Sequence, residues 1–405
     1  MANTLTPTDV YSIVNSVAHQ VLGTTTLTAV DTTSFVTVGE TLLRTGTENT
    51  LNAISTVLGK TIFANRKYTS KFAILRNDDM RWGDQIRKIV NLPLDAEASE
   101  DYNTDIAPTQ LADGASIDHY KIKNFKALQL NFYGTKKLQR HFTRYRDQLA
   151  QAFKSEEEFA RFIDNALIEF SNDIETQNES EARAVVCNYI TGLEVMNSGR
   201  VIDLVSEFNT KFGTSYTAAD LQTTYLKEFA QFFTATVKKF SDRMTDRTNL
   251  FHESISGYAD IVRHTPKEKQ RMIMFAPLFT DVKAYIYSEL FNPQYLDINK
   301  YEEVNYWQTP IKGGLGDYDG IAAINYKPNY LDTATGQSTD AASAVSLDCV
   351  LGILYDVDAL GINEQFDYTA TTPFNAAGGY ANTYYHWRHN YWNDFTENAV
   401  VFVMK

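Results

Sequence analysis

The stretch that decides the fold runs from Ser155 to Ile190 and reads SEEEFARFIDNALIEFSNDIETQNESEARAVVCNYI. Its apolar residues recur at steps of three and four, the period of one face of an α-helix. They are Phe159, Phe162, Ile163, Ala166, Leu167, Phe170 and Ile174, followed by Ala182, Val185, Val186, Tyr189 and Ile190. The pattern predicts one helix of roughly 35 residues, about 50 Å long at ~1.5 Å per residue. That is longer than a compact domain usually needs.

The ends and the middle of this helix carry different signals. Ser155 and Glu158 have the spacing of a capping box, in a first turn where acidic residues favour the helix dipole. Gly192 follows the last apolar residue and is predicted to end the helix. Between the apolar runs, Glu175 to Glu181 is polar nearly all round, so we expect the middle of the helix not to be deeply buried.

Composition narrows the class of protein. A chain of 405 residues is long enough for two or three domains, and a formal net charge of -13 argues against a surface dedicated to nucleic acid. The two cysteines, Cys187 and Cys349, lie in apolar runs, so we expect buried thiols, with a disulfide as the alternative. The start, MANTLTPTDV, lacks the pattern of a secretion signal, and no run of 18 apolar residues occurs. We therefore expect neither a secretion signal nor a membrane span.

Two helical patterns precede a change of period. A helix is predicted from Thr6 to Gly23, then a Thr-rich stretch to Thr37, then a weaker helical pattern from Leu42 to Leu58. We interpret these first sixty residues as an arm more than a domain.

Ahead of the long helix the apolar period becomes two, which predicts strands. The outgoing run holds Trp82, Ile86, Val90, Leu92 and Leu94, and the returning run holds Tyr120, Ile122, Leu128, Leu130 and Phe132. We expect a long hairpin whose apolar face another element buries, because a two-stranded ribbon is marginal alone. Its loop, Asp95 to Asp118, has acids, Gly and Pro but no Lys or Arg, and is predicted to be exposed.

A basic segment lies between this hairpin and the acidic start of the long helix. It contains Lys136, Lys137, Arg140, Arg144 and Arg146. A solvated face is the default interpretation, and charge pairing with a neighbouring subunit is the alternative.

The remainder of the chain mixes helices and strands. Helices are predicted at 201–208, 218–240 and 281–291, strands at 271–275, 349–355, 365–370 and 399–404, loops at 318–336 and 339–346, and an aromatic strand at 380–392. This order predicts an α/β or α+β layer.

Candidate sites for chemistry are weak. The glycines Gly313, Gly314, Gly316 and Gly320 lack the Lys-Ser/Thr of a phosphate loop, and Asp317 and Asp319 lack the other ligands of a calcium loop. His386 and His389 are three apart in a segment that favours a strand, which would place them on opposite faces. No GxSxG, HExxH or CxxC motif occurs. We therefore nominate no catalytic, cofactor-binding or metal-binding residue.

The last segment, GGYANTYYHWRHNYWNDFTENAVVFVMK from Gly378 to Lys405, consists of an aromatic strand, a short link and a terminal apolar strand. It resembles the end of tailed-bacteriophage major capsid proteins of the Hong Kong 97 type, in particular those of short-tailed phages of the phi-29 group. The order of the predicted elements is similar to that family's order of N-terminal arm, E-loop, spine helix, A-domain and return to the P-domain.

The resemblance implies an α+β, Hong Kong 97-type capsid fold. Its parts would be an N-terminal arm at 1–66, an E-loop hairpin at 67–133, a P-domain at 134–220 with the spine helix at 155–190, an A-domain at 221–364 and a return to the P-domain at 365–405. The polar middle of the spine would then face solvent or a neighbour. Its apolar ends would be held by the P-domain sheet, including Tyr384 to Trp392.

The resemblance also implies a function. The chain would be a shell subunit that assembles in the host cytoplasm as hexamers and pentamers, around DNA contacted without sequence specificity, with a separate scaffolding protein and a portal as partners. The alternatives are an encapsulin-like nanocompartment and, from another class, a soluble enzyme with its site between Leu221 and Tyr355.

In that fold the E-loop lies across an adjacent subunit, which would bury the hairpin, and charged residues would meet between neighbours. The expected inter-subunit contacts are Ile86, Val90, Lys121, Lys123, Leu128, Leu130, Lys136, Lys137, Arg140, Glu156, Glu157, Glu175 and Glu179.

Overall fold

A computed structural model describes the chain at 7–23, 28–45, 49–50, 53, 71–76, 86–92, 94, 100–101, 109–124, 126–146, 156–256, 261–278, 280, 301–308 and 322–405. Within these ranges the side chains at 9, 100–101, 109–110, 156–171 and 364–368 are not described. The chain forms two compact units. The first is Met1–Asp84, Gly134–Val185 and Gly361–Tyr391, and the second is Gln85–Tyr133, Val186–Leu360 and Trp392–Lys405.

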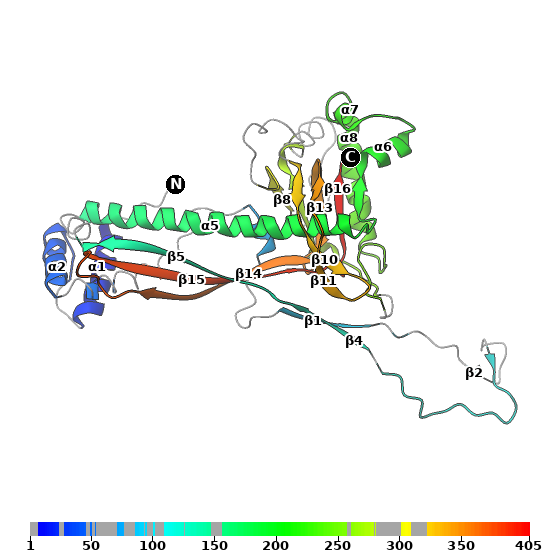
Figure 1. Ribbon diagram of the computed structural model, residues 1–405, viewed down its shortest axis with the longest axis horizontal. Helices are drawn as coiled ribbons and strands as arrows, with labels where there is room; N and C mark the ends of the chain where they lie inside the picture. Colours follow the sequence, from blue (N-terminus) through cyan, green and yellow to red (C-terminus); the bar gives the residue numbers. More distant parts are fainter. Residues whose placement is uncertain are drawn as a thin grey trace. The chain divides into compact units, whose positions relative to one another are not determined.

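The first unit is built on helix α5, Glu156–Val195, and a three-stranded sheet (Figure 1). The strand order is β14 (Leu360–Thr371), β15 (Tyr380–Asn393) and β5 (Gly134–Tyr145). Strands β15 and β5 are antiparallel, in a register that runs from Tyr380 opposite Tyr145 to Tyr391 opposite Gly134. The predicted long helix and aromatic strand are therefore confirmed, whereas β5 coincides with the basic segment, which had no strand assigned.

Alternate residues of β15 are buried, and they form the face of the sheet that α5 covers. Tyr385 and Trp387 of this strand form a cluster with Ile174 of α5. Aromatic side chains bury a large apolar area each, so this period-two pattern fixes which face of β15 meets the helix.

Two N-terminal helices in this unit share a small core. Helix α1 is Pro7–Leu22 and helix α2 is Thr32–Thr45. Val10, Val14, Val17, Phe35, Val38 and Leu42 are buried together, and Ala381 of β15 belongs to the same cluster. A 3-10 turn, η1, follows at Ala73–Leu75.

Helix α2 begins inside the Thr-rich stretch that was predicted to separate two helices, so that boundary was wrong. The side chain of Asp31 accepts from the Ser34 amide at 2.7 Å, which caps the first turn. The hydroxyls of Thr37, Thr41 and Thr45 each donate to the carbonyl four residues earlier, at 2.8 to 2.9 Å. These bonds give the threonine hydroxyls acceptors inside the helix, although threonine has a low helix propensity.

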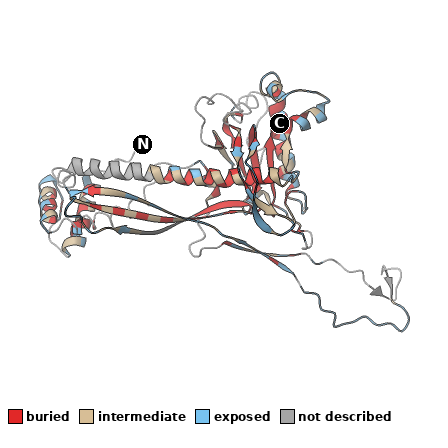
Figure 2. Cartoon of the chain, viewed as in Figure 1, coloured by how far each residue is buried: buried red, intermediate tan, exposed pale blue. Residues whose placement is uncertain are grey.

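The second unit is organised around a five-stranded sheet in the order β6, β16, β13, β7, β8. The strands are β6 (Val201–Asp203), β16 (Ala399–Val403), β13 (Val350–Asp356), β7 (Gln270–Phe275) and β8 (Tyr301–Val304). Strand β13 is antiparallel to both neighbours, and each outer strand is parallel to the strand beside it. All residues of β13 and β16 are buried (Figure 2), as expected of central strands covered on both faces.

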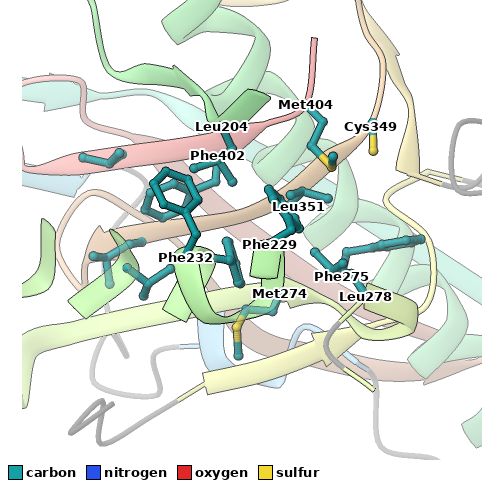
Figure 3. Close-up of a cluster of buried hydrophobic side chains, with 14 of the residues drawn as sticks. Leu204, Phe229, Phe232, Met274, Phe275, Leu278, Cys349, Leu351, Phe402 and Met404 are labelled. Carbon is teal, nitrogen blue, oxygen red and sulfur yellow. The ribbon is translucent and has the colours of Figure 1, made fainter. Parts of the chain in front are cut away.

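Helices α6 (Leu204–Phe212), α7 (Ala218–Gln222) and α8 (Leu226–Arg243) pack on this sheet. Figure 3 shows Phe229 and Phe232 of α8 among Leu351 of β13 and Phe402 of β16. Phe233 meets Phe402 edge-on, with ring centroids 6.0 Å apart. A second 3-10 turn, η2, is Lys267–Lys269.

Four small ladders complete this unit. Strand β1 (Ile86–Asn91) pairs with β4 (Ala127–Phe132), β2 (Glu100–Asp101) with β3 (Thr109–Gln110), β9 (Ile324–Tyr326) with β12 (Val345–Leu347), and β10 (Asn329–Asp332) with β11 (Gln337–Asp340).

Several predicted elements of the second unit need correction. The segment 201–208 begins as β6 rather than as a helix, because it pairs with β16, and Asp203 then caps α6 by accepting from the Val205 amide. The segments predicted as loops at 318–336 and 339–346 contain β9 to β12. The strands predicted at 271–275, 349–355 and 399–404 and the helical pattern at 218–240 are confirmed. The helix predicted at 281–291 lies outside the described residues.

Candidate functional site: hairpin, long helix and buried charge cluster

The base of the predicted hairpin forms as expected, with β1 antiparallel to β4. Ile86 lies opposite Phe132, Lys88 opposite Leu130 and Val90 opposite Leu128. These residues share one face, and the side chains of Ile86 and Leu128 on it are buried. Leu92, Leu128 and Leu130 pack with Ile255, Ile261 and Leu331 of the same unit. The chain itself therefore covers the base of the hairpin, and no neighbouring subunit is needed for that burial.

Beyond its base, the returning arm of the hairpin exposes large apolar side chains. The side chains of Tyr120 and Ile122 are 89% and 82% exposed. Lys121 and Lys123 alternate with them and are also exposed. Single exposed apolar side chains are ordinary, but exposed apolar side chains that lie together, as these two do on alternate residues, are typical of a surface that meets a partner.

One face of the middle of helix α5 is buried, whereas Thr176 and Ser180 are exposed, so the expected solvated polar segment is found on part of the helix only. Glu175 accepts from Arg76 Nη2 at 2.7 Å, and Glu179 accepts from the Lys71 amide at 3.3 Å and pairs with Arg183. The Arg183 guanidinium lies 4.9 Å from the centroid of the Phe72 ring. Residues 71–76 therefore cover this part of the helix. Buried carboxylates require such partners, which explains why a polar segment can lie inside.

The basic strand β5 pairs with the same helix. Lys136 pairs with Glu181, and Arg140 Nη1 lies 2.5 Å from Asp173 Oδ2. Lys137 is exposed. These two ion pairs fall within one subunit, so the basic segment is neither a purely solvated face nor free for neighbours at Lys136 and Arg140. The side chains of Glu156 and Glu157 lie outside the described part of the chain.

A buried charge cluster joins the hairpin to the link between β15 and β16. Lys88 Nζ lies 2.5 Å from Asp394 Oδ2 and also pairs with Glu397. Arg263 Nη2 lies 3.4 Å from Glu397 Oε1, and Arg200 Nη2 lies 3.3 Å from Glu253 Oε1. The cluster thus holds three cations and three carboxylates, which balances its charge.

Burial and charge shift the titration of this cluster in opposing ways. Burial opposes the charged form of Lys88, but the carboxylates of Asp394 and Glu397 outweigh it and raise the pKa of Lys88. Burial raises the pKa of Glu397 even though Lys88 and Arg263 favour its charged form. Burial, with the charges of Arg263 and Arg200, lowers the pKa of the nearby His252.

The link that carries two of these acids is itself tightly held. Asp394 Oδ1 accepts from the amide and the hydroxyl of Thr396, at 2.9 and 2.6 Å. The Phe395 ring stacks on Tyr189 of α5, with centroids 4.8 Å apart, and closely approaches Gly192. Sequence reasoning missed the cluster, although Lys88 gave one signal: it is a charged residue in phase with the apolar positions 86, 90 and 92 of its strand.

The remaining candidates are placed only in part by the described residues. His386 and His389 lie in strand β15, and His389 is buried whereas His386 is partly exposed, as the predicted strand requires. Cys187 and Cys349 are buried thiols that form no disulfide with each other, as expected. The glycine cluster Gly313 to Gly320 lies outside the described residues. Among the residues that are described, no group of three or more His, Cys, Asp or Glu could hold a metal ion.

No helix in the described part of the chain combines the length and the apolarity needed to cross a membrane.

Comparison with solved structures shows the fold. The chain is similar to a capsid structure of Staphylococcus phage Andhra, with a TM-score of 0.52 and 10% identity over 83% of this chain and 84% of that chain. Another match is the mature capsid of bacteriophage PhiM1, with a TM-score of 0.43 and 10% identity over 84% of this chain and 89% of that chain. No curated protein matched the sequence.

The expected Hong Kong 97-type α+β capsid fold is confirmed, and neither an encapsulin-like shell nor a soluble enzyme is favoured. A family model described as Phi29-like phage major capsid protein matches residues 13–403, nearly the whole chain. With its long helix, aromatic sheet and hairpin, the chain belongs to the Phi29-like phage major capsid protein family, whose members form the icosahedral shell of the virion.

Proposed function

We propose that the returning arm of the hairpin, residues 117–124, is the surface through which this capsid subunit contacts a neighbouring copy. The observation that carries the proposal is the exposure of Tyr120 and Ile122, which alternate with Lys121 and Lys123. An extended segment with alternating apolar and basic side chains suits a partner that offers apolar pockets and carboxylates. Each copy has 50 Asp and Glu against 37 Lys and Arg, so the surface of a second copy offers carboxylates to these lysines, although the net charges of the two copies repel each other.

The other residues that were expected at contacts between subunits fall into an exposed group and a buried group. Lys121, Lys123 and Lys137 are exposed and remain proposed contacts between subunits. Ile86, Leu128, Glu175 and Glu179 are buried within the subunit, so their proposed role is to hold the elements that make contacts.

The parts of the fold keep their proposed assignments. Residues 1–66 serve as the N-terminal arm, 67–133 as the E-loop, 134–220 and 365–405 as the P-domain, and 221–364 as the A-domain. The grouping of 134–185 with 361–391 in one compact unit supports the P-domain assignment. The subunit has no catalytic role, and it assembles in the host cytoplasm with a separate scaffolding protein and a portal.

The experiment compares the double variant Tyr120→Ser and Ile122→Ser with the wild type. Shells are quantified by sedimentation and counted by electron microscopy, and thermal melting checks the fold of the free subunit. Loss of a central aromatic anchor costs about 2 kcal/mol or more, so shell yield should fall by at least about tenfold.

The matched control is Gln129→Ser with Asn131→Ser, two exposed residues at the base of the hairpin that bond to each other at 2.8 Å. It should assemble as the wild type does. Wild-type yield from the Tyr120 and Ile122 variant, with the subunit folded, would refute the contact.

A further inference from the structure

The base of the hairpin is attached to its own subunit by a limited apolar contact. Among the described residues of the hairpin, Leu92, Leu128 and Leu130 join the cluster with Ile255, Ile261 and Leu331. Apolar contacts have no fixed direction, and a two-stranded ribbon is marginally stable alone. This contact can therefore hold the hairpin against the body of the second unit without fixing the direction in which it points.

Lys88 supplies the directional contact. It lies on the inner face of β1 between Ile86 and Val90, and its side chain is only 22% exposed. Its ammonium group reaches two carboxylates, those of Asp394 and Glu397, which are 2% and 9% exposed. Charge-assisted hydrogen bonds depend on geometry, so they specify one placement of the strand.

The two carboxylates are positioned without help from the hairpin. Asp394 is fixed by the amide and hydroxyl of Thr396, and its own amide donates to the Ala359 carbonyl at 2.6 Å. Arg263 Nε donates to the Thr396 carbonyl at 3.2 Å. The acidic socket is thus built into the body of the unit, and Lys88 is the hairpin's contribution to it.

Charge balance makes the contact selective for the placement of β1 that brings Lys88 to Asp394 and Glu397. With Lys88 in place, the cluster of Lys88, Arg200, Arg263, Glu253, Asp394 and Glu397 has equal numbers of cations and carboxylates. Without Lys88, Glu397 would keep only Arg263 of these cations at close range, and Asp394 would keep its bonds to Thr396 but no close cation of the cluster. An uncompensated buried charge is strongly unfavourable, so the socket favours the placement of β1 that delivers an ammonium group.

We propose that Lys88 is an ionic latch: its bonds to Asp394 and Glu397 fix the direction of the hairpin in the free subunit before it meets a neighbour. Lys88 acts here as a positioning residue, because the carboxylates that it meets belong to a link held by bonds to Thr396 and Ala359. Its consequence for assembly rests on the proposed contact role of residues 117–124, but its effect on the free subunit does not.

Hydrogen exchange of the unassembled subunit tests the latch. Lys88→Met keeps the length of the side chain and removes its charge, and Arg87→Met is the control, because Arg87 is the exposed neighbour on the opposite face of β1. In Lys88→Met, amides of 86–91 and 127–132 should exchange at least about tenfold faster, as expected for the loss of one charge-assisted hydrogen bond. Amides of β13 and β16 should not change, and Arg87→Met should match the wild type.

A second variant keeps the test decisive if Lys88→Met fails to fold. The pair Lys88→Met and Glu397→Gln removes one charge of each sign, so the body regains its balance while the hairpin still lacks its ammonium group. Faster exchange confined to the hairpin supports the latch. Exchange equal to that of Arg87→Met in both variants overturns it.

Measurements of shell assembly distinguish the latch at Lys88 from the proposed contact at residues 117–124. The Tyr120 and Ile122 variant should leave exchange at 86–91 unchanged, whatever its effect on shells. If Lys88→Met frees the hairpin and shells still form with wild-type yield and shape, the latch does not position the hairpin for assembly, and that part of the proposal is refuted.

Discussion

At Gly192 the long helix closely approaches Phe395 of the C-terminal link. A Cβ at this position would lie 2.7 Å from Cζ of Phe395 and 2.9 Å from its Cε1. That ring is buried and stacked on Tyr189, so it has little room to move. Glycine is therefore required here by packing. The helix continues to Val195, and the turn that ends it contains Asn197 and Gly199, both with positive φ.

Gly192→Ala tests this close approach. Alanine would gain about 1 kcal/mol of helix propensity over glycine, but the clash should cost about 1–3 kcal/mol, which leaves a net loss of up to about 2 kcal/mol. We expect a net loss in the free energy of unfolding of the unassembled subunit, measured by denaturant titration. Phe395→Leu in the same chain should recover part of the loss. A Gly192→Ala subunit more stable than the wild type would contradict this account, and Ser180→Ala, on an exposed part of α5, serves as control.

For single residues, the sequence predicts the local secondary structure better than it predicts which distant residues a side chain contacts. The polar run from Glu175 to Glu181 indicated a solvated surface, because nothing in it reveals that residues 71–76 lie over the helix. Lys88 was placed in the correct strand, but its carboxylates lie about three hundred residues further along the chain, at Asp394 and Glu397. Such pairings depend on the fold and have no local signal.

At the scale of elements, strand β15 carries a buried ionisable group beneath the long helix. His389 is buried, and neither of its ring nitrogens has a hydrogen-bond partner among the described residues. Burial first, and then the charges of Arg76 and Lys136, lower the pKa of His389 to about 4. Glu175 and Glu181 on α5 neutralise those two cations in turn. His389 is therefore neutral in the folded subunit near pH 7.

A pH dependence follows from this shift. In the unfolded chain this histidine binds a proton when the pH falls below its ordinary pKa of 6.5. In the folded chain it does so only near its lowered pKa of about 4. Stability is therefore lost as the pH falls between these values. From pH 7 to pH 5 the wild type should lose about 1–2 kcal/mol more unfolding free energy than His389→Leu, which cannot titrate. Parallel pH profiles for the two proteins would show that His389 is charged, or solvated, in the folded state.

Elements with strong periodicity are predictable, and elements defined by pairing are not. Helix α5 and strands β7, β13, β15 and β16 follow from apolar spacing in their own sequences. Strand β6 is three residues long and exists because β16 lies beside it, and β9 to β12 are short ladders in polar sequence. In these cases the partner strand, rather than local propensity, decides the structure.

At the scale of the whole molecule, order along the chain is more informative than any single motif. Hairpin, long helix, mixed sheet and aromatic return strand occur in the order of the capsid family, and the match of the family model over residues 13–403 confirms that interpretation. A net charge of -13 agrees with a shell that encloses DNA without binding it tightly. The contacts in the shell form between several copies of the chain. No recognisable pattern in the sequence of one chain shows which surfaces take part in them.

The most direct test of the central claim is electron microscopy of the purified chain, alone and mixed with a scaffolding protein from the same phage. The chain should form closed icosahedral particles, in which density for residues 117–124 lies against an adjacent subunit. A chain that remains a small, discrete oligomer under both conditions, while its thermal melting shows a folded subunit, would contradict the account.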